Sequence, residues 1–263
     1  MLPYLLSDEA PKKGKEMLYI FNHALDSTLF TIPGIGFEVT RFGVMIVLAG
    51  LVLLAMAMRM DRKSAVPQGF IRNMFESIML FIRDEMVRPT MGRQYGDRFL
   101  PFFCTLFLFI LAINLLGLIP IPIVGGTATS NYLVTGTLAI MILGLSVVSG
   151  FVVHGAGGFM KTFIPGGLPA AIVPLLFPLE VIGFLIKHSV LCVRLFANMI
   201  AGHLVLGAFI GLIFVSKSYL TAVPSIGMAL FISGLELLVA FIQAYVFTLL
   251  SVLFVGGVVH PDH

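Results

Sequence analysis

Five long apolar runs dominate the chain, and their lengths predict helices that cross a membrane. A bilayer core about 30 Å thick needs roughly 20 apolar residues in a helix, and residues 42–58, 99–119 and 132–153 match that length. Residues 170–215 and 220–259 are apolar over about 40 residues each, nearly twice what one upright span needs. The pattern predicts an all-α polytopic membrane protein with about five to six membrane helices.

Residues 59–98 follow a different pattern, in which apolar side chains recur at helical spacing. The apolar stripe consists of Phe70, Ile71, Met74, Phe75, Ile78 and Phe81. Because Arg72, Glu76 and Arg83 fall largely off it, we expect an amphipathic helix that lies on the membrane surface. A short soluble hairpin helix remains the alternative.

The composition excludes two classes of protein. Hydrophobic residues make up 59% of the 263 residues and charged residues 11%, and the mean hydropathy is +1.06. A soluble domain is nearer half apolar and a quarter charged, so a soluble globular enzyme and a disordered chain are both excluded. The net charge of +3 is too small to suggest nucleic acid. Cys104 and Cys192 lack metal-site spacing and are expected to be buried thiols, with no metal bound.

Basic residues predict the orientation. Eight of them fall within residues 59–98: Arg59, Arg62, Lys63, Arg72, Arg83, Arg88, Arg93 and Arg98. Residues 120–131 carry no charge. The positive-inside rule therefore puts residues 59–98 and the C-terminus in the cytoplasm and the N-terminus outside, although Lys12, Lys13 and Lys15 favour the reverse.

We expect four segments along the chain. Residues 1–40 form an N-terminal segment outside the cytoplasm, with no processed signal peptide. Residues 41–98 hold the first membrane helix and the amphipathic helix. Residues 99–169 form a pair of membrane helices with an uncharged outer loop, and residues 170–259 form a long helical hairpin.

Few ionisable groups interrupt the apolar runs. Glu180 and Glu236 are the two carboxylates between residues 99 and 259. A charge at membrane depth costs at least about 2.5–3.5 kcal/mol on insertion scales. A chain this apolar that keeps these two acids and Arg194 uses them for function, or, alternatively, for a structural ion pair.

Helical spacing gathers the polar residues of each long run on one face. The face of the first run carries Glu180, Lys187, Arg194, Asn198 and Ala201. On the second run, Glu236 and Gln243 are seven residues apart and share a face. If the runs form an antiparallel hairpin that turns near residue 219, Arg194 faces Gln243 and His203 faces Glu236. The sequence then predicts two polar layers roughly 10–14 Å apart along the helices.

These residue types suit proton transfer with a barrier. Arginine effectively never deprotonates, so Arg194 is a fixed positive charge that repels a travelling cation. Histidine and glutamate can bind and release protons near neutral pH. We therefore infer two half-paths, marked by Glu180 on one side of Arg194 and by His203 with Glu236 on the other.

Stretches that include these residues resemble subunit a of the F-type ATP synthase, in its bacterial or mitochondrial-like form. They are NLLGLIP (114–120), LEVIGFLIKHSVLCVR (179–194), LCVRLFANMIAGHLVLGAFIGL (191–212) and GLELLVAFIQAYVFTLLSVLF (234–254). The resemblance covers roughly residues 95–259 and is most specific in RLFANMIAGH.

The resemblance implies a proton-conducting stator subunit of a rotary motor in the bacterial plasma membrane. Its partners would be a ring of c-subunits, b-type stator subunits and the remaining ATP synthase subunits. The long runs would form a steeply tilted hairpin against the ring. A carboxylate on each c-subunit would take a proton from one half-channel and release it to the other, which couples proton flow to ATP synthesis.

The resemblance also implies residue roles. The family's essential arginine, its following asparagine and its glutamine match Arg194, Asn198 and Gln243. The cytoplasmic-side acid matches Glu180, and the outer-path pair and a nearby polar residue match His203, Glu236 and Asn114. Gly117 departs from members with an acid there, and Tyr132-Leu133 interrupts an Asn-rich stretch. Lys187 and His188 are auxiliary candidates that could equally well snorkel or pack.

Three other protein classes compete with this reading. A secondary transporter typically shows two related halves, and an ion channel a repeated filter, neither of which the sequence displays. An ATP-using enzyme needs a phosphate loop, but HGAGGFMKT (154–162) lacks the glycine before Lys161 that such a loop requires. We therefore expect no cofactor, and ATP chemistry carried out by other subunits.

Overall fold

The computed structural model describes residues 28–32, 37–58, 70–118, 129, 131–163, 172–216 and 218–259. Within them, four helices are long and apolar enough to cross a membrane, and a shorter apolar helix covers Phe42–Met56. The prediction of an all-α polytopic membrane protein is confirmed, and the chain is an integral membrane protein.

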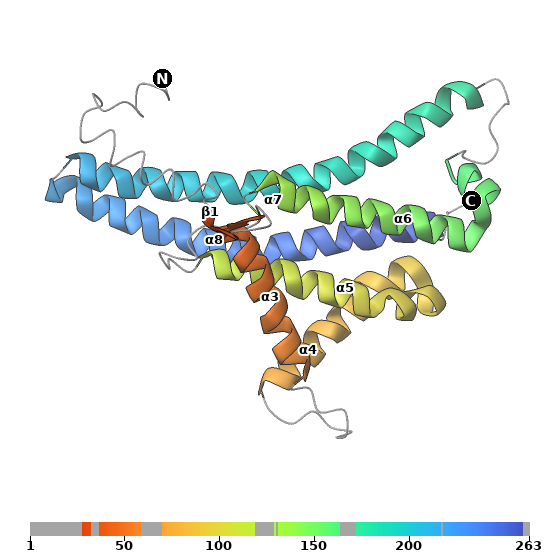
Figure 1. Ribbon diagram of the computed structural model, residues 1–263, viewed down its shortest axis with the longest axis horizontal. Helices are drawn as coiled ribbons and strands as arrows, with labels where there is room; N and C mark the ends of the chain where they lie inside the picture. The colour runs from red at the N-terminus through yellow and green to blue at the C-terminus, as the bar shows by residue number, and fades with distance from the viewer. Residues whose placement is uncertain are drawn as a thin grey trace. The chain divides into compact units, whose positions relative to one another are not determined.

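The described helices are α3 (Arg41–Met58), α4 (Phe70–Phe81), the π-helix η1 (Ile82–Val87), α5 (Arg88–Leu118), α6 (Tyr132–Lys161), α7 (Val173–Ser216) and α8 (Tyr219–Val259). Helices α3, α5, α6, α7 and α8 each cover most of one apolar run, and Figure 1 shows them in chain order by colour. Helix α4 contains the predicted amphipathic stripe, in which Phe75 is buried. Its position on a membrane surface stays a prediction.

A two-stranded antiparallel pair precedes α3, and the sequence analysis did not predict it. Strand β1 (Thr28–Ile32) pairs with β2 (Phe37–Thr40), and an irregularity lies between Thr28 and Phe30. The Thr40 hydroxyl then accepts a hydrogen bond from the Gly43 amide at 3.2 Å. This side chain caps the first turn of α3 by satisfying a free backbone donor.

Two of the helices bend at glycines with left-handed backbone angles. Gly92 in α5 has φ 68° and Gly155 in α6 has φ 69°, a region that favours glycine because it has no Cβ. Each of these helices therefore consists of two helical pieces that meet at the glycine.

The fold consists of two compact units, each assembled from three segments of the chain. The first unit comprises Met1–Val52, Leu111–Val134 and Leu195–Gln243. The second comprises Leu53–Ile110, Thr135–Arg194 and Ala244–His263. Helices α3, α5, α6, α7 and α8 each contribute residues to both units. The four segments expected from the sequence describe order along the chain and stay a prediction.

In the first unit, the second half of α7 and the first part of α8 form an antiparallel pair. Helix α7 ends at Ser216 and α8 begins at Tyr219, which confirms the predicted turn. The carbonyl oxygen of Ser218 accepts hydrogen bonds from the amides of Thr221 and Ala222 at 3.2 and 3.0 Å. These bonds close the first turn of α8.

In the second unit, the end of α8 packs closely against α5 and α6. A Cβ on Gly256 would lie 2.5 Å from Cγ2 of Thr90 on α5, and a Cβ on Gly150 of α6 would lie 2.6 Å from Cγ1 of Val258. The imidazole of His154 contacts the carbonyl oxygens of Val258 and Val259 at 3.1 and 3.2 Å. The last turn of α8 is thus held by both backbone and side-chain contacts.

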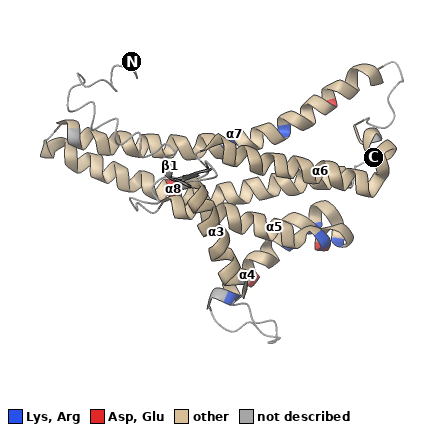
Figure 2. Cartoon of the chain, viewed as in Figure 1, with Lys and Arg blue, Asp and Glu red and all other residues tan. Residues whose placement is uncertain are grey.

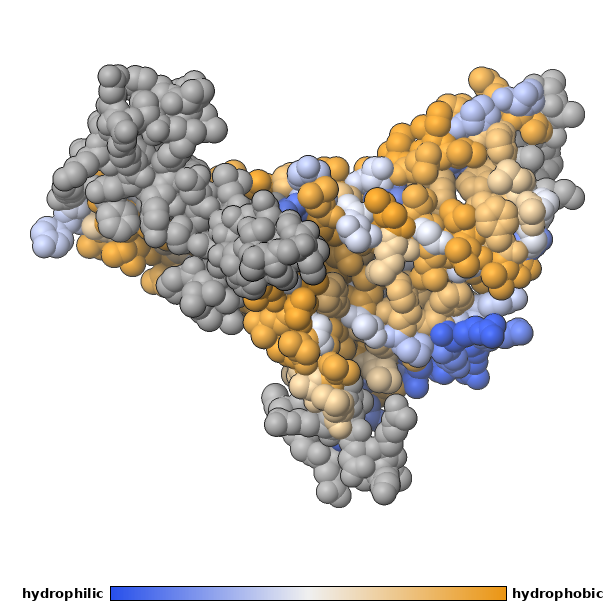
Figure 3. Space-filling view, in the orientation of Figure 1, coloured by the Kyte–Doolittle hydropathy of each residue, from blue (hydrophilic) through white to orange (hydrophobic). Residues whose placement is uncertain are grey.

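Most of the exposed charges gather in one part of the second unit, while apolar groups are exposed over much of the described surface. Lys and Arg gather around α4 and the start of α5 (Figure 2), where Arg88 pairs with Asp84 at 3.3 Å and with Asp97 at 3.1 Å. On the face seen in Figure 3, apolar side chains cover most of the described surface. Val152 is 77% exposed and Leu175 69%. Such apolar exposure fits a chain surrounded by lipid or partner helices.

Candidate functional site

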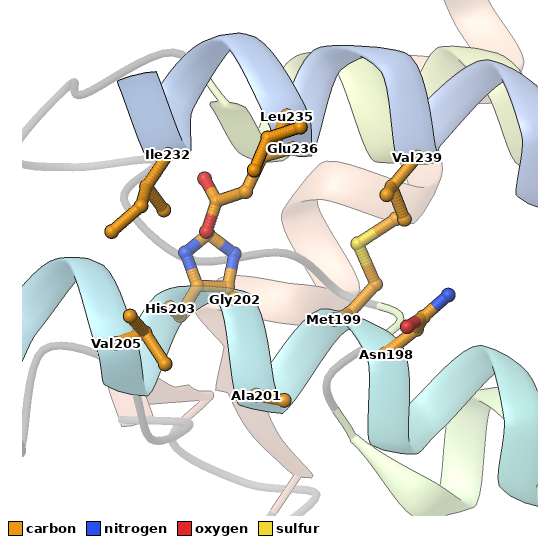
Figure 4. Close-up of a pocket in the computed structure, with 10 residues that line it drawn as sticks. All are labelled: Asn198, Met199, Ala201, Gly202, His203, Val205, Ile232, Leu235, Glu236 and Val239. Carbon is orange, nitrogen blue, oxygen red and sulfur yellow. The ribbon is translucent and has the colours of Figure 1, made fainter. Parts of the chain in front are cut away.

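A cavity of about 270 Å³ lies between α7 and α8 in the first unit (Figure 4). It is lined by Asn198, Met199, Ala201, Gly202, His203, Val205, Ile232, Leu235, Glu236 and Val239. Most of these side chains are apolar, and His203 and Glu236 are the titratable ones. The cavity therefore brings the predicted His–Glu pair together in a mostly apolar setting.

Glu236 extends from α8 toward the α7 backbone. Its Oε1 lies 2.6 Å from the point that a Cβ on Gly202 would occupy, so the missing side chain of that glycine makes room for the carboxylate. This oxygen is buried and has no hydrogen-bond partner in the described part of the chain. Figure 4 shows the carboxylate and the His203 imidazole directed into the same space.

An amide pair joins the same two helices at the Asn198 end of the cavity. The Nδ2 atom of Asn198 donates a hydrogen bond to Oε1 of Gln243 at 3.3 Å. Gln243 is 3% exposed, whereas Asn198 lies on the exposed side of α7. Gln243 was expected to face Arg194, which lies one helical turn before Asn198. Since Arg194 belongs to the other unit, that pairing stays a prediction.

The remaining charged candidates lie on α7 in the second unit. Arg194 and Lys187 are exposed and Glu180 is half-buried. No ion pair involving these three is formed with another described residue of that unit. These three residues form a row of ionisable groups on the surface of α7. Exposed apolar side chains, among them Leu179, Ile186 and Val193, surround this row.

His188 points in a different direction, into the interior of the second unit, and is 2% exposed. Its Nδ1 lies 2.8 Å from the Phe184 carbonyl oxygen and its Nε2 lies 3.4 Å from the Ser146 hydroxyl. The ring also contacts Phe184 and Phe254, with centroid distances of 4.6 and 4.7 Å. His188 therefore lies apart from the row that Lys187 and Arg194 share.

Asn114 is fully buried near the end of α5. Its Oδ1 accepts a hydrogen bond from the Thr129 hydroxyl at 2.9 Å, and its Nδ2 has no partner among the described residues. A buried amide donor without a partner costs free energy unless water satisfies it. This position belongs to the first unit, as the cavity does.

Comparison with known proteins bears on the same residues. Residues 40–256 match the family model of the ATP synthase A chain. The chain belongs to this family.

Three relatives show how far the similarity to A chains extends. The ATP synthase subunit a of Chloroherpeton thalassium is 42% identical over 239 residues, which cover 88% of this chain and 70% of the relative. That of Myxococcus xanthus is 40% identical over 245 residues, covering 88% and 80%. That of Mesorhizobium japonicum is 43% identical over 207 residues, covering 76% and 79%.

Two observations concern the cysteines, expected to be buried thiols, and metal binding, which was not expected. Cys104 is buried, as predicted, while Cys192 is only half-buried and its Sγ contacts the Thr135 hydroxyl at 3.4 Å. Neither forms a disulfide. The described residues contain no cluster of three or more His, Cys, Asp or Glu that could hold a metal ion.

Sequence reasoning missed three members of these sites. Gly202 makes room for Glu236, Thr129 pairs with Asn114, and Ser146 faces His188. Gly202 could have been found, because the antiparallel register that pairs His203 with Glu236 also brings the preceding glycine close to that acid. Thr129 and Ser146 lie 15 and 42 residues from their partners, and no pattern in the sequence pairs them.

Proposed function

We propose that this A chain is the proton-conducting stator subunit of the membrane sector of an F-type ATP synthase. It offers two offset half-channels to the carboxylates of a c-subunit ring, and Arg194 forms the barrier between them. Family membership supports the assignment to the complex. The observation that carries the mechanism is the cavity in which a buried, unpartnered Glu236 oxygen lies with His203.

The cavity is suited to pass protons through water. An unpaired carboxylate oxygen in apolar surroundings is costly unless it is hydrated or protonated, and a volume of about 270 Å³ has room for several water molecules. Glu236 would exchange protons with such water, and His203, Asn114 and Gln243 would continue the path by hydrogen bonding. These residues form the outer half-channel of the proposal.

Glu180 marks the opposite half-channel, and Arg194 separates the two. A proton that crosses the membrane potential releases about 2.3 kcal/mol per 100 mV, and a direct leak would dissipate this free energy as heat. The permanent charge of Arg194 repels a proton that moves alone, whereas a c-ring carboxylate can pair with the guanidinium as it passes. Lys187 would contribute a second positive charge on the same helix face.

The large exposed surface of α7 favours a ring of helices as its partner. The most apolar 18-residue window of the α7 span is 11% buried within the chain, against 44% for the α8 span. Arg194, Asn198 and Ala201 all lie on exposed positions of α7. We infer that this face lies against the c-ring, that α7 and α8 form a tilted hairpin, and that b-type stator subunits and the lipid bilayer cover other surfaces.

We place the chain in the plasma membrane of a bacterium, with the N-terminus outside and the C-terminus in the cytoplasm. The support is the basic character of residues 59–98 together with the positive-inside rule. The chain takes part in ATP synthesis through proton transport, and we assign it no nucleotide chemistry of its own.

The experiment substitutes Glu236 by Gln in the assembled ATP synthase and follows ATP-driven proton pumping into vesicles. Gln keeps the size of the side chain but cannot bind or release a proton, so we expect pumping to fall by about 100-fold, as for lost general acid–base groups. Glu76→Gln on the exposed surface of α4 is the control and should pump normally. Normal pumping by Glu236→Gln would refute the proposed outer path.

A further inference from the structure

Within residues 173–194 of α7, the only buried side chains are His188 and Leu191. The other inward contacts of this stretch are apolar: Phe177, Val181 and Phe184 are partly buried against a cluster of Phe159, Phe163 and Val258. Apolar packing is non-directional, so polar contacts between helices supply the directional part of the orientation of α7. In this unit, the orientation of α7 decides which way Arg194 points.

His188 supplies such a contact, and it does so where three helices meet. Its Nε2 lies 3.4 Å from Ser146 Oγ on α6, and its ring lies 4.7 Å, between centroids, from Phe254 on α8. Phe184, one turn earlier on α7, also contacts the ring, at 4.6 Å between centroids. A second polar contact from the same face of α7 joins Cys192 to Thr135 on α6. Both contacts join the same face of α7 to α6.

The hydrogen-bonding groups define the protonation of the ring. The Phe184 carbonyl oxygen can only accept, so Nδ1, at 2.8 Å, carries a proton and donates it. In the neutral imidazole Nε2 is then an acceptor, and the Ser146 hydroxyl is the donor that faces it. The same hydroxyl donates a hydrogen bond to the Ile142 carbonyl oxygen at 2.9 Å, so its single proton alternates between that oxygen and Nε2.

We propose that His188 is a positioning residue: through Ser146 it fixes the rotation of α7 about its axis and thereby the direction of the Arg194 side chain. The two residues are six positions apart, which corresponds to roughly 120° around the helix and roughly 9 Å along it. His188 thus points into the second unit while Arg194 is directed to the exposed surface. The inference rests on the proposed function, because it assigns its consequence to the barrier role of Arg194.

The test compares variants in the assembled ATP synthase at equal amounts of assembled chain, measuring proton pumping per ATP hydrolysed. His188→Leu and Ser146→Ala remove the interhelical hydrogen bond, and each should lower this ratio about three- to tenfold, the size of one such bond in a membrane. His188→Gln keeps an acceptor near the place of Nε2, so this variant should have the same pumping-to-hydrolysis ratio as the unmodified enzyme. His188→Asn places its amide near Nδ1 instead and should behave as His188→Leu does.

The controls separate positioning from packing. Ser189→Ala removes a neighbouring hydroxyl whose hydrogen bond, among the described residues, goes to the Leu185 carbonyl oxygen within α7 at 3.0 Å, and it should leave the ratio unchanged. If His188→Leu does not assemble, Ser146→Ala carries the test, since it leaves the ring in place. A normal ratio in Ser146→Ala, or a loss in His188→Gln equal to that in His188→Asn, would overturn the positioning role.

Arg194→Ala is measured alongside to keep the two proposals apart. If Arg194→Ala pumps normally, the proposed function fails. If Arg194→Ala does not pump while Ser146→Ala pumps as the unmodified enzyme does, only the positioning role of His188 fails.

Discussion

Oε1 of Glu236 lies 2.6 Å from the position that the first side-chain atom of residue 202 would take if it were not glycine. The carboxylate therefore reaches the α7 backbone beside His203, at a point where a methyl group would exclude it. An absent side chain on one helix thus determines the place of a functional group on the other.

Gly202→Ala is predicted to move the Glu236 carboxylate without preventing assembly. The clashing atom is the far end of a flexible side chain, so the carboxylate shifts and the helices keep their packing. A misplacement of about 1 Å can cost up to about 100-fold in rate, and we expect ATP-driven proton pumping to fall by about tenfold or more. The measurement is the initial rate of vesicle acidification at equal complex content.

Gly211→Ala is the matched control for that variant. Gly211 also lies on α7 in the first unit, and a Cβ there would meet no atom within 4 Å. Pumping by Gly211→Ala should equal that of the unmodified enzyme. If both variants lose activity equally, helix flexibility rather than room for Glu236 is the cause.

The bond between Asn198 and Gln243 predicts that these residues act together. We compare Asn198→Ala, Gln243→Leu and the double variant for proton pumping. The two amides bond to each other at 3.3 Å. The loss of pumping in the double variant should therefore be smaller than the sum of the two single losses, by a coupling of about 0.6–1.7 kcal/mol for a membrane hydrogen bond. Strictly additive losses would show that the bond has no role in pumping.

The close contact of α8 with α5 predicts that substitutions at two neighbouring glycines differ in their effect on stability. A Cβ on Gly256 would lie 2.5 Å from Cγ2 of Thr90, and a β-branched side chain in a helix cannot turn away easily. Gly256→Ala should destabilise the chain by about 1–3 kcal/mol, seen as a lower unfolding temperature of the purified complex.

Gly257→Ala provides the comparison, since a Cβ there would meet no atom within 4 Å. Alanine is about 1 kcal/mol more favourable than glycine inside a helix, so this variant should be as stable as the unmodified chain or slightly more so. Equal destabilisation by both variants would contradict the contact between α8 and α5.

Removing the exposed ion pairs of Arg88 is predicted to have little effect on stability or on proton pumping. Arg88 binds Asp84 and Asp97 at the surface, where such pairs contribute about 0–1 kcal/mol. Arg88→Ala should therefore lower the unfolding temperature of the complex only slightly and leave proton pumping unchanged. A large loss of stability would mean that this network supports more than the local turn.

Much of the fold follows from the sequence because apolar length alone identifies a membrane helix. The ends of α7 and α8 fall within a few residues of the expected runs, and Ser218 marks the break between them. The pairing of His203 with Glu236 in one cavity also follows from helical period and antiparallel register. These predictions depend on regular geometry, which the sequence specifies directly.

The rest depends on contacts that no period encodes. The β1–β2 pair is short, and a two-stranded pair is marginal on its own. His188 faces inward toward Ser146 on another helix. The sequence alone does not show that His188 faces inward while its neighbour Lys187 faces outward. The row of ionisable residues on α7 could be predicted, but the inward direction of His188 beside it could not.

The central claim is that the charge of Arg194 prevents protons from passing directly between two half-channels. The most direct measurement is ATP-driven proton pumping by the assembled enzyme with Arg194→Ala, with Arg194→Lys beside it because lysine lacks the planar guanidinium and can lose its proton. The account predicts that neither variant pumps, although both assemble and hydrolyse ATP. Pumping by Arg194→Ala at the rate of the unmodified enzyme would contradict it.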